Sequence, residues 1–298
     1  MNHTETATDR APDPSGEPGP AWGDPFDRIV CGSDGTDESM AGASQARRLV
    51  PHAPMVLVHV VDVVDAAPRR RDYPSWIHAR RDAAHRLLDE SRRRLETGGV
   101  RAAAVTVEEG EVPDALRYAA AGPGRPLLAI GSGDDTDRLL RYSGPPPTGA
   151  RLSLRIVEAV TCSVLVARRP PEPDRFPVSI TVGLDGSEPS LDAYRVAEAI
   201  AARTGARLAV IVALGGKGAD LRALHEVDRA ISISAVTEDK PAKALLDAAS
   251  GSDLIVVGNR GLHGLRSLGS VSNRVVTASP ASVLVVRGGG SPTGGPGV

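Results

Sequence analysis

The chain has 298 residues, of which 41% are hydrophobic and only 3% are aromatic. This length favours two domains of ordinary size, and an apolar content of Ala, Val, Leu and Ile is typical of layered α/β domains rather than of an aromatic β-sandwich. The 35 Lys and Arg residues nearly balance the 37 Asp and Glu residues, which gives a net charge of −2. This balance excludes a bulk electrostatic attraction to nucleic acid or to an anionic membrane.

The cysteines and the hydropathy pattern indicate a soluble, cytoplasmic protein. Cys31 and Cys162 both lie in apolar, strand-like runs, which excludes a disulfide scaffold and favours a reducing compartment. No apolar run of the sequence reaches the roughly 18–20 residues that cross a bilayer. The polar N-terminal segment also lacks the apolar core of a secretory signal.

Segments rich in Pro and Gly divide the chain into two parts. Residues 1–24 and 288–298 have no hydrophobic periodicity, and we expect them to be disordered tails. The tandem prolines within residues 170–177 predict a linker, because proline continues neither a helix nor a central strand. The expected domains are therefore residues 25–169 and 178–287.

In the first part, short runs of Val, Ile and Leu alternate with helical patterns. The runs are nearly continuous, which is typical of strands buried on both faces of a parallel sheet. The expected strands are Arg28–Cys31, Met55–Val63, Arg101–Val107, Leu127–Ile130 and Val164–Ala167. An apolar stripe predicts a helix over Trp76–Leu95.

The second part repeats this plan and is shorter around its second strand and helix. Its expected strands are Ile180–Gly183, Leu208–Leu214, Ile231–Val236, Leu254–Val257 and Val283–Val286. A helix is expected over Ser190–Arg203, ending before Gly205. Right-handed crossovers then predict two tandem Rossmann-like domains, each with a doubly wound, five-stranded parallel sheet. The apolar last strands of the two copies, VLVARR and VLVVRG, are expected to pair with each other.

Two features of the second copy lie at the expected carboxyl ends of strands, where doubly wound sheets bind ligands. Asp185 follows the first strand in VGLDGS, and GNRGLHGLRSLGSVSNRV follows the fourth strand. Glycines allow close approach to an anion, and a helix that starts at Ser270 offers free N–H groups to phosphate. A carboxylate such as Asp185 is suited to hold Mg²⁺ that bridges phosphates. The alternative is that these glycines only turn the chain between strand and helix.

These residues, in a tandem arrangement over about residues 26–287, resemble the universal stress protein family. The glycine pattern of the family is matched by Gly258, Gly261, Gly269 and Ser270, with a spacer, residues 262–268, that is shorter than usual. The resemblance implies that the second copy binds ATP, or ADP or AMP, with Mg²⁺. The implied contacts are Gly258, Asn259, Arg260, Gly261, Gly269, Ser270, Val271 and Ser272 at the phosphates, Asp185 at the ribose and metal, and Ala213 or Leu214 at adenine. The shorter spacer is expected to close less completely over the phosphates.

The first copy departs further from this pattern. Asp34 matches the acid after the first strand, but Asp134 stands where the second glycine belongs, and Ala150 and Arg151 stand where Gly269 and Ser270 do in the second copy. Asp134 and its acidic neighbours would repel a polyanion. We therefore predict that the first copy is a structural half with a degenerate nucleotide motif.

Other kinds of site find little support in the sequence. Neither HExxH nor CxxC occurs, which makes a zinc site improbable. Ser187 is interpreted as a helix cap rather than a nucleophile. The arginine runs at 69–71 and 92–94 are interleaved with acids, which predicts a solvated helix face and not a nucleic-acid surface.

The sequence thus predicts a cytoplasmic, ATP-binding, stress-response regulatory protein with an unknown protein partner. Hydrolysis is expected to be slow or absent, because no general base or arginine finger can be assigned. Two alternatives stay open: a nucleotide-free interaction or scaffold protein of the same fold, and a slow ATP-consuming transferase or hydrolase. Because last strands often form the dimer contact in the family, the resemblance implies a pseudo-dimer within the chain, with a homodimer of whole chains also open.

Overall fold

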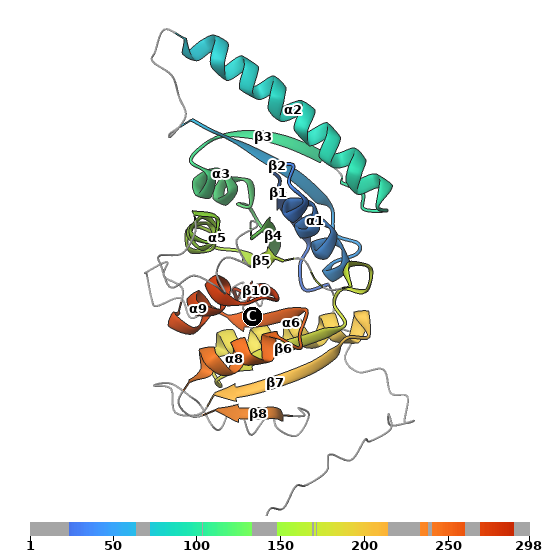
Figure 1. The fold of residues 1–298 in the computed structure, drawn as a ribbon, viewed down its shortest axis with the longest axis vertical. Coiled ribbons are helices and arrows are strands. Elements are labelled where there is room, and N and C mark those ends of the chain that lie inside the picture. Colours follow the sequence, from blue (N-terminus) through green and yellow to red (C-terminus); the bar gives the residue numbers. More distant parts are fainter. Residues whose placement is uncertain are drawn as a thin grey trace, which may run out of the picture.

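The computed structural model describes residues 24–63, 72–102, 104–132, 148–168, 170, 172–213, 233–237, 240–259 and 269–288. In these segments ten strands form one sheet, in the order β3-β2-β1-β4-β5-β10-β9-β6-β7-β8 (Figure 1). The strands are β1 (Arg28–Gly32), β2 (Met55–Asp62), β3 (Ala104–Gly110), β4 (Pro126–Gly131), β5 (Ser163–Ala167), β6 (Ser179–Leu184), β7 (Arg207–Ala213), β8 (Ile233–Thr237), β9 (Leu254–Gly258) and β10 (Ser282–Val286). All ten expected strands are present, and the pairs within each half are parallel.

Helices cover both faces of this sheet (Figure 1). They are α1 (Asp37–Leu49), α2 (Tyr73–Thr97), α3 (Val112–Ala119), α5 (Thr148–Ala159), α6 (Glu188–Thr204), α8 (Pro241–Ala249) and α9 (Ser270–Ala278), with a short 3-10 helix at Pro173–Arg175 in the expected linker. One buried cluster joins α1, α2 and α6 to one face, and a second joins α3, α5, α8 and α9 to the other. The doubly wound α/β architecture is therefore confirmed.

The boundary of β3 differs most from the sequence prediction. The expected strand stops at Val107, because two glutamates interrupt the apolar run. In the structure, β3 pairs with β2 as far as Glu109 and Gly110. At the edge of the sheet, β3 leaves these glutamates partly exposed, so their charge does not oppose strand formation.

The two halves join through their last strands. β5 and β10 pair in an antiparallel manner, with Leu165 opposite Leu284 and Val164 opposite Val285. All four side chains are fully buried. The pairing expected from the apolar strands is confirmed, and it makes one continuous sheet from two parallel halves. The domain boundaries at 25–169 and 178–287 stay predictions.

None of the helices in the described segments is both long and apolar enough to cross a membrane.

Candidate functional site

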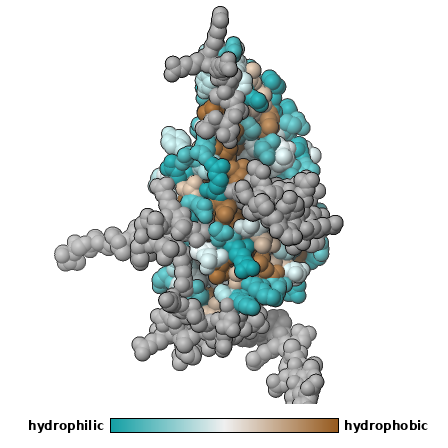
Figure 2. All heavy atoms as spheres, turned by 60° about the vertical axis from the view of Figure 1, so that its left-hand side comes forward, coloured by the Kyte–Doolittle hydropathy of each residue, from teal (hydrophilic) through white to brown (hydrophobic). Residues whose placement is uncertain are grey.

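The sheet brings three of the sequence-predicted positions to one edge. β6 lies between β9 and β7 and is parallel to both. Asp185 follows β6, Ala213 ends β7 and Gly258 ends β9. These residues therefore share the carboxyl edge of the second half, and the crevice between β6 and β9 is the point where the winding reverses. Figure 2 brings forward the side to which the arrowheads of β7 and β8 point in Figure 1, and it shows brown apolar patches bordered by teal hydrophilic residues.

Asp185 is held in a tight turn before α6. Its Oδ1 atom accepts hydrogen bonds from the backbone N–H of Ser187 at 3.1 Å and from the Ser187 hydroxyl at 2.6 Å. The hydroxyl of Ser190 donates to the Ser187 carbonyl at 2.8 Å. Ser187 is the N-cap of α6 as expected, but its hydroxyl bonds to Asp185 instead of to a helix N–H. The turn thus fixes a carboxylate at the positive end of a helix.

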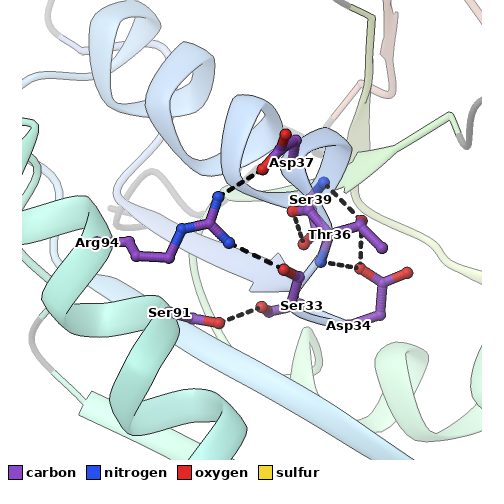
Figure 3. Close-up of polar contacts among 8 residues, drawn as sticks. Ser33, Asp34, Thr36, Asp37, Ser39, Ser91 and Arg94 are labelled. Carbon is purple, nitrogen blue, oxygen red and sulfur yellow. Dashed lines mark hydrogen bonds and ion pairs between the residues drawn. The ribbon is translucent and has the colours of Figure 1, made fainter.

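The first half repeats this turn. Asp34 Oδ1 accepts from the Thr36 backbone at 3.1 Å and from the Thr36 hydroxyl at 2.6 Å (Figure 3). The Ser39 hydroxyl donates to the Thr36 carbonyl, as Ser190 does to Ser187. The role of Ser190 was missed from the sequence, although the repeat places Ser39 opposite it. Both copies therefore position a carboxylate by the same local chemistry.

Helix α2 contacts this turn in the first half. Arg94 forms an ion pair with Asp37 at 2.5 Å and donates to the Gly35 carbonyl at 3.1 Å (Figure 3). The Ser33 hydroxyl donates to Ser91 at 3.4 Å. Side chains of α2 therefore occupy one side of the turn that holds Asp34.

The Asp34 carboxylate makes a testable contribution to stability. Burial raises its pKa, but hydrogen bonds from Thr36 and Ser39 outweigh burial, and the pKa lies below its ordinary value of 3.8. A carboxyl whose pKa is lower in the folded state stabilises the fold above its unfolded pKa, and this contribution is lost as the pH falls through the folded value. We expect Asp34→Asn to cost about 1 kcal/mol at pH 7, the worth of a partly exposed hydrogen-bonded group.

Thermal unfolding of wild type and Asp34→Asn between pH 7 and pH 2 checks this expectation. The difference in stability should shrink on the acid side of the ordinary Asp pKa, because both proteins then carry a neutral side chain. A difference that stays constant over the whole range would contradict it.

Close packing against a helix requires glycine at position 258, and the sequence did not reveal this requirement. An added Cβ would lie 2.2 Å from the Pro189 carbonyl oxygen and 2.7 Å from the Ser190 nitrogen. The matching Gly131 of the first half would place its Cβ 2.7 Å from the Glu38 carbonyl carbon. The helix after the first strand thus packs directly on this glycine in both halves, including the half in which the rest of the glycine pattern is missing.

Helix α9 starts beside the end of β9. Gly269 is its N-cap, and within the described segments no side chain caps the helix and no atom lies within 4 Å of a Cβ built on Gly269. The Ser272 hydroxyl donates to the Gly258 carbonyl at 3.0 Å and ties the helix to the strand. Asn259 is 6% exposed, and its Oδ1 has no hydrogen-bond partner in the part of the chain that the structure describes. Ser270 is exposed, and Val271 is partly buried.

Some sequence-predicted residues lie outside the described segments. These are Leu214, Arg260, Gly261, Asp134 and its acidic neighbours. Ala150 and Arg151 lie inside the first turn of α5, not before its start. No group of three or more His, Cys, Asp or Glu side chains in the described part of the chain is placed to hold a metal ion.

Comparisons with known proteins agree with this fold. The model of the universal stress protein family matches residues 216–287. A universal stress protein of Thermus aquaticus is 35% identical, and the match covers 37% of this chain and 98% of that protein. A universal stress protein of Mycobacterium tuberculosis is 27% identical, and the match covers 87% of this chain and 96% of that protein.

Among solved structures, a universal stress protein from Archaeoglobus fulgidus has a TM-score of 0.67 at 18% identity, covering 88% of this chain and 98% of that chain. This likeness concerns the fold. A universal stress protein in complex with cAMP is 34% identical, with a TM-score of 0.32, and covers 37% of this chain and 97% of that chain. The matched family model and the almost complete coverage of the Thermus relative show that this chain belongs to the universal stress protein family.

Proposed function

We propose that the second half binds an adenine nucleotide, ATP, ADP or AMP, at the carboxyl edge between β6 and β9. The observation that carries the proposal is the start of α9 beside the end of β9: among the described residues no side chain caps this helix, and none contacts a Cβ built on its N-cap Gly269. The first N–H groups and the positive dipole end of a helix favour phosphate. The proposed phosphate site comprises Gly258, Asn259, Arg260, Gly261, Ser270, Val271 and Ser272.

Asp185 is proposed to meet the ribose and to ligate Mg²⁺ when a polyphosphate is bound. It follows β6, the strand that pairs with the strand of Gly258, and its turn holds the carboxylate at the same edge of the sheet. Mg²⁺ commonly takes one or two carboxylates and completes its shell with phosphate oxygens and water, so a single carboxylate fits this donor set. When bound, the ion would neutralise phosphate charge.

The adenine base is proposed to lie at the end of β7, against the backbone of Ala213 or Leu214. β7 is the neighbour of β6 on the side away from β9, so a nucleotide that spans the edge would meet phosphate, ribose and base positions in that order. The first half is proposed to be structural, and the contacts of α2 with the Asp34 turn support this role. The whole protein is proposed to act in the cytoplasm as a nucleotide-dependent regulator with slow or no hydrolysis.

Two matched variants test the site. Titration calorimetry with ATP and Mg²⁺ should show binding to wild type, and Asp185→Asn should weaken it about tenfold or more, the worth of a charged contact. Asp34→Asn changes the same turn in the first half and should leave the affinity unchanged.

A third variant separates binding from folding. Ser270→Asp adds a negative charge at the start of α9, which favours the helix but repels phosphate. It should weaken ATP binding while the melting temperature stays level or rises. Absence of ATP binding to wild type would favour the scaffold alternative, and multiple turnover abolished by Asp185→Asn would favour an enzyme.

A further inference from the structure

Two arginines link the halves in a reciprocal manner. Arg168 follows β5, and its backbone N–H donates to the hydroxyl of Ser282, the first residue of β10, at 2.9 Å. Arg287 follows β10, and its backbone N–H donates to the hydroxyl of Ser163, the first residue of β5, at 3.0 Å. The Arg168 guanidinium also donates to a carbonyl of α9 at 2.7 Å, and the Arg287 guanidinium to one of α5 at 2.5 Å. The two junctions therefore share one hydrogen-bond plan.

One residue makes the junctions different. In α1, the Gln45 amide donates to the Arg168 carbonyl at 2.5 Å and accepts from the Ser282 hydroxyl at 2.7 Å. Gln45 is buried, and Arg168 is only 5% exposed. The repeat that matches Asp34 with Asp185 places Val196 of α6 at the position of Gln45. A valine side chain makes neither hydrogen bond, so the second junction lacks the link that the Gln45 amide forms in the first.

A cavity of about 490 Å³ lies at the second junction. Both halves line it, the first through Arg125 and Cys162 and the second through Arg195, Val196 and Arg287. Its volume is within the range of about 300–1,000 Å³ that holds small organic ligands. It lies at the amino end of β5 and is separate from the proposed nucleotide site.

The polar lining of this cavity is cationic. Its two acids already have partners, since Asp192 pairs with Arg195 at 2.8 Å and Asp24 pairs with Arg203 at 2.9 Å. Arg125 and Arg287 have no acidic partner among the described residues. The Nε atom of Arg287 is buried and makes no hydrogen bond to any described residue. Burial also lowers the pKa of Arg287, and the nearby Cys162 thiol opposes this shift in part.

We propose that this junction cavity binds a small organic anion, a phosphate or carboxylate group on an apolar body. Arg287 and Arg125 supply the uncompensated positive charge, and the hydroxyl of Ser163 adds a polar group beside them. The apolar part of the wall is formed by Pro25, Phe26, Pro126, Val196 and Val286. Because the lining comes from both halves, a bound anion stabilises their association by mass action.

Phenyl phosphate and benzoate, with benzyl alcohol as the neutral control, test the proposal on the full chain. Cys162 lines the cavity and reports occupancy through its rate of alkylation by iodoacetamide, read by peptide mass spectrometry. Cys31 is the internal control, because it is fully buried and burial raises the pKa of its thiol to about 12. At least one anion should bind by calorimetry and, at about ten times its Kd, slow Cys162 alkylation about tenfold, because only the unoccupied protein reacts. The anion that protects Cys162 distinguishes phosphate from carboxylate.

Variants locate the binding. Val196→Gln places at the second junction the residue that closes the first. It should abolish anion binding and the protection of Cys162 from alkylation. Should this variant fail to fold, Arg125→Gln alters an exposed side chain and should weaken binding about tenfold. Asp185→Asn should bind the anion as wild type does, so failure of the nucleotide proposal is distinguishable. Absence of binding by both anions, equal protection by benzyl alcohol, or unchanged binding in a folded variant would overturn the proposal.

Discussion

Replacing Gly258 by alanine is expected to destabilise the protein by about 3 kcal/mol or more. The new Cβ would lie 2.2 Å from the Pro189 carbonyl oxygen and 2.4 Å from its carbonyl carbon. These are backbone atoms at the start of α6, so they cannot rotate away as a flexible side chain would. The helix must shift from β9, and its packing in the core is lost. Urea unfolding of the variant measures the loss.

Gly269→Ala is the matched control within the same glycine pattern. Gly269 has a φ of −59° and a ψ of 150°, which alanine adopts without strain, and its Cβ would lie within 4 Å of no atom of the described residues. We expect a change within about 0.5 kcal/mol. Equal stabilities of the Gly258 and Gly269 variants would refute the packing explanation. The expected difference also means that loss of nucleotide binding in a Gly258 variant does not by itself identify a phosphate contact.

Leu165→Ala is expected to cost about 3–5 kcal/mol, the range for removing a buried leucine from a core that cannot collapse around it. Leu165 is fully buried in β5 and faces Leu284 of β10 where the two halves join. The cavity opens between strands that are hydrogen-bonded on both sides, so relaxation is limited. The decrease in the free energy of unfolding in urea checks the prediction.

Tyr118→Ala provides the comparison for this variant. Tyr118 is a large side chain of α3 that is 73% exposed, so its removal should change stability by less than about 0.5 kcal/mol. A Leu165→Ala protein as stable as Tyr118→Ala would show that the joined strands contribute little to the fold.

Much of the fold follows from local patterns in the sequence. Continuous runs such as Leu127–Ile130 form strands because burial on both faces needs apolar residues at every position. The pairing of β5 with β10 was also predictable, since both strands are apolar on each face and end their sheets. The end of β3 was missed because the tolerance for Glu109 depends on its place at the sheet edge.

The candidate site was predictable only in part. Topology places Asp185 and Gly258 on neighbouring strands, and the sequence pattern captures this arrangement. The contact of Gly258 with Pro189 depends on the distance between a helix and a strand, which no local pattern encodes. The link from Gln45 to Ser282 joins residues 237 positions apart. Its only trace in the sequence is the repeat itself, which matches Arg168 with Arg287 and Ser282 with Ser163.

Because the two copies are fused in one chain, the two junctions between the halves do not need to have the same sequence. In a symmetric homodimer both sides of the contact have the same sequence, so a glutamine at the position of Gln45 would occur on both sides or on neither. Here Gln45 and Val196 stand at matching positions of one chain. Tandem duplication thus allowed the junction at Gln45 to be closed by hydrogen bonds, while the matching junction at Val196 stayed free to change.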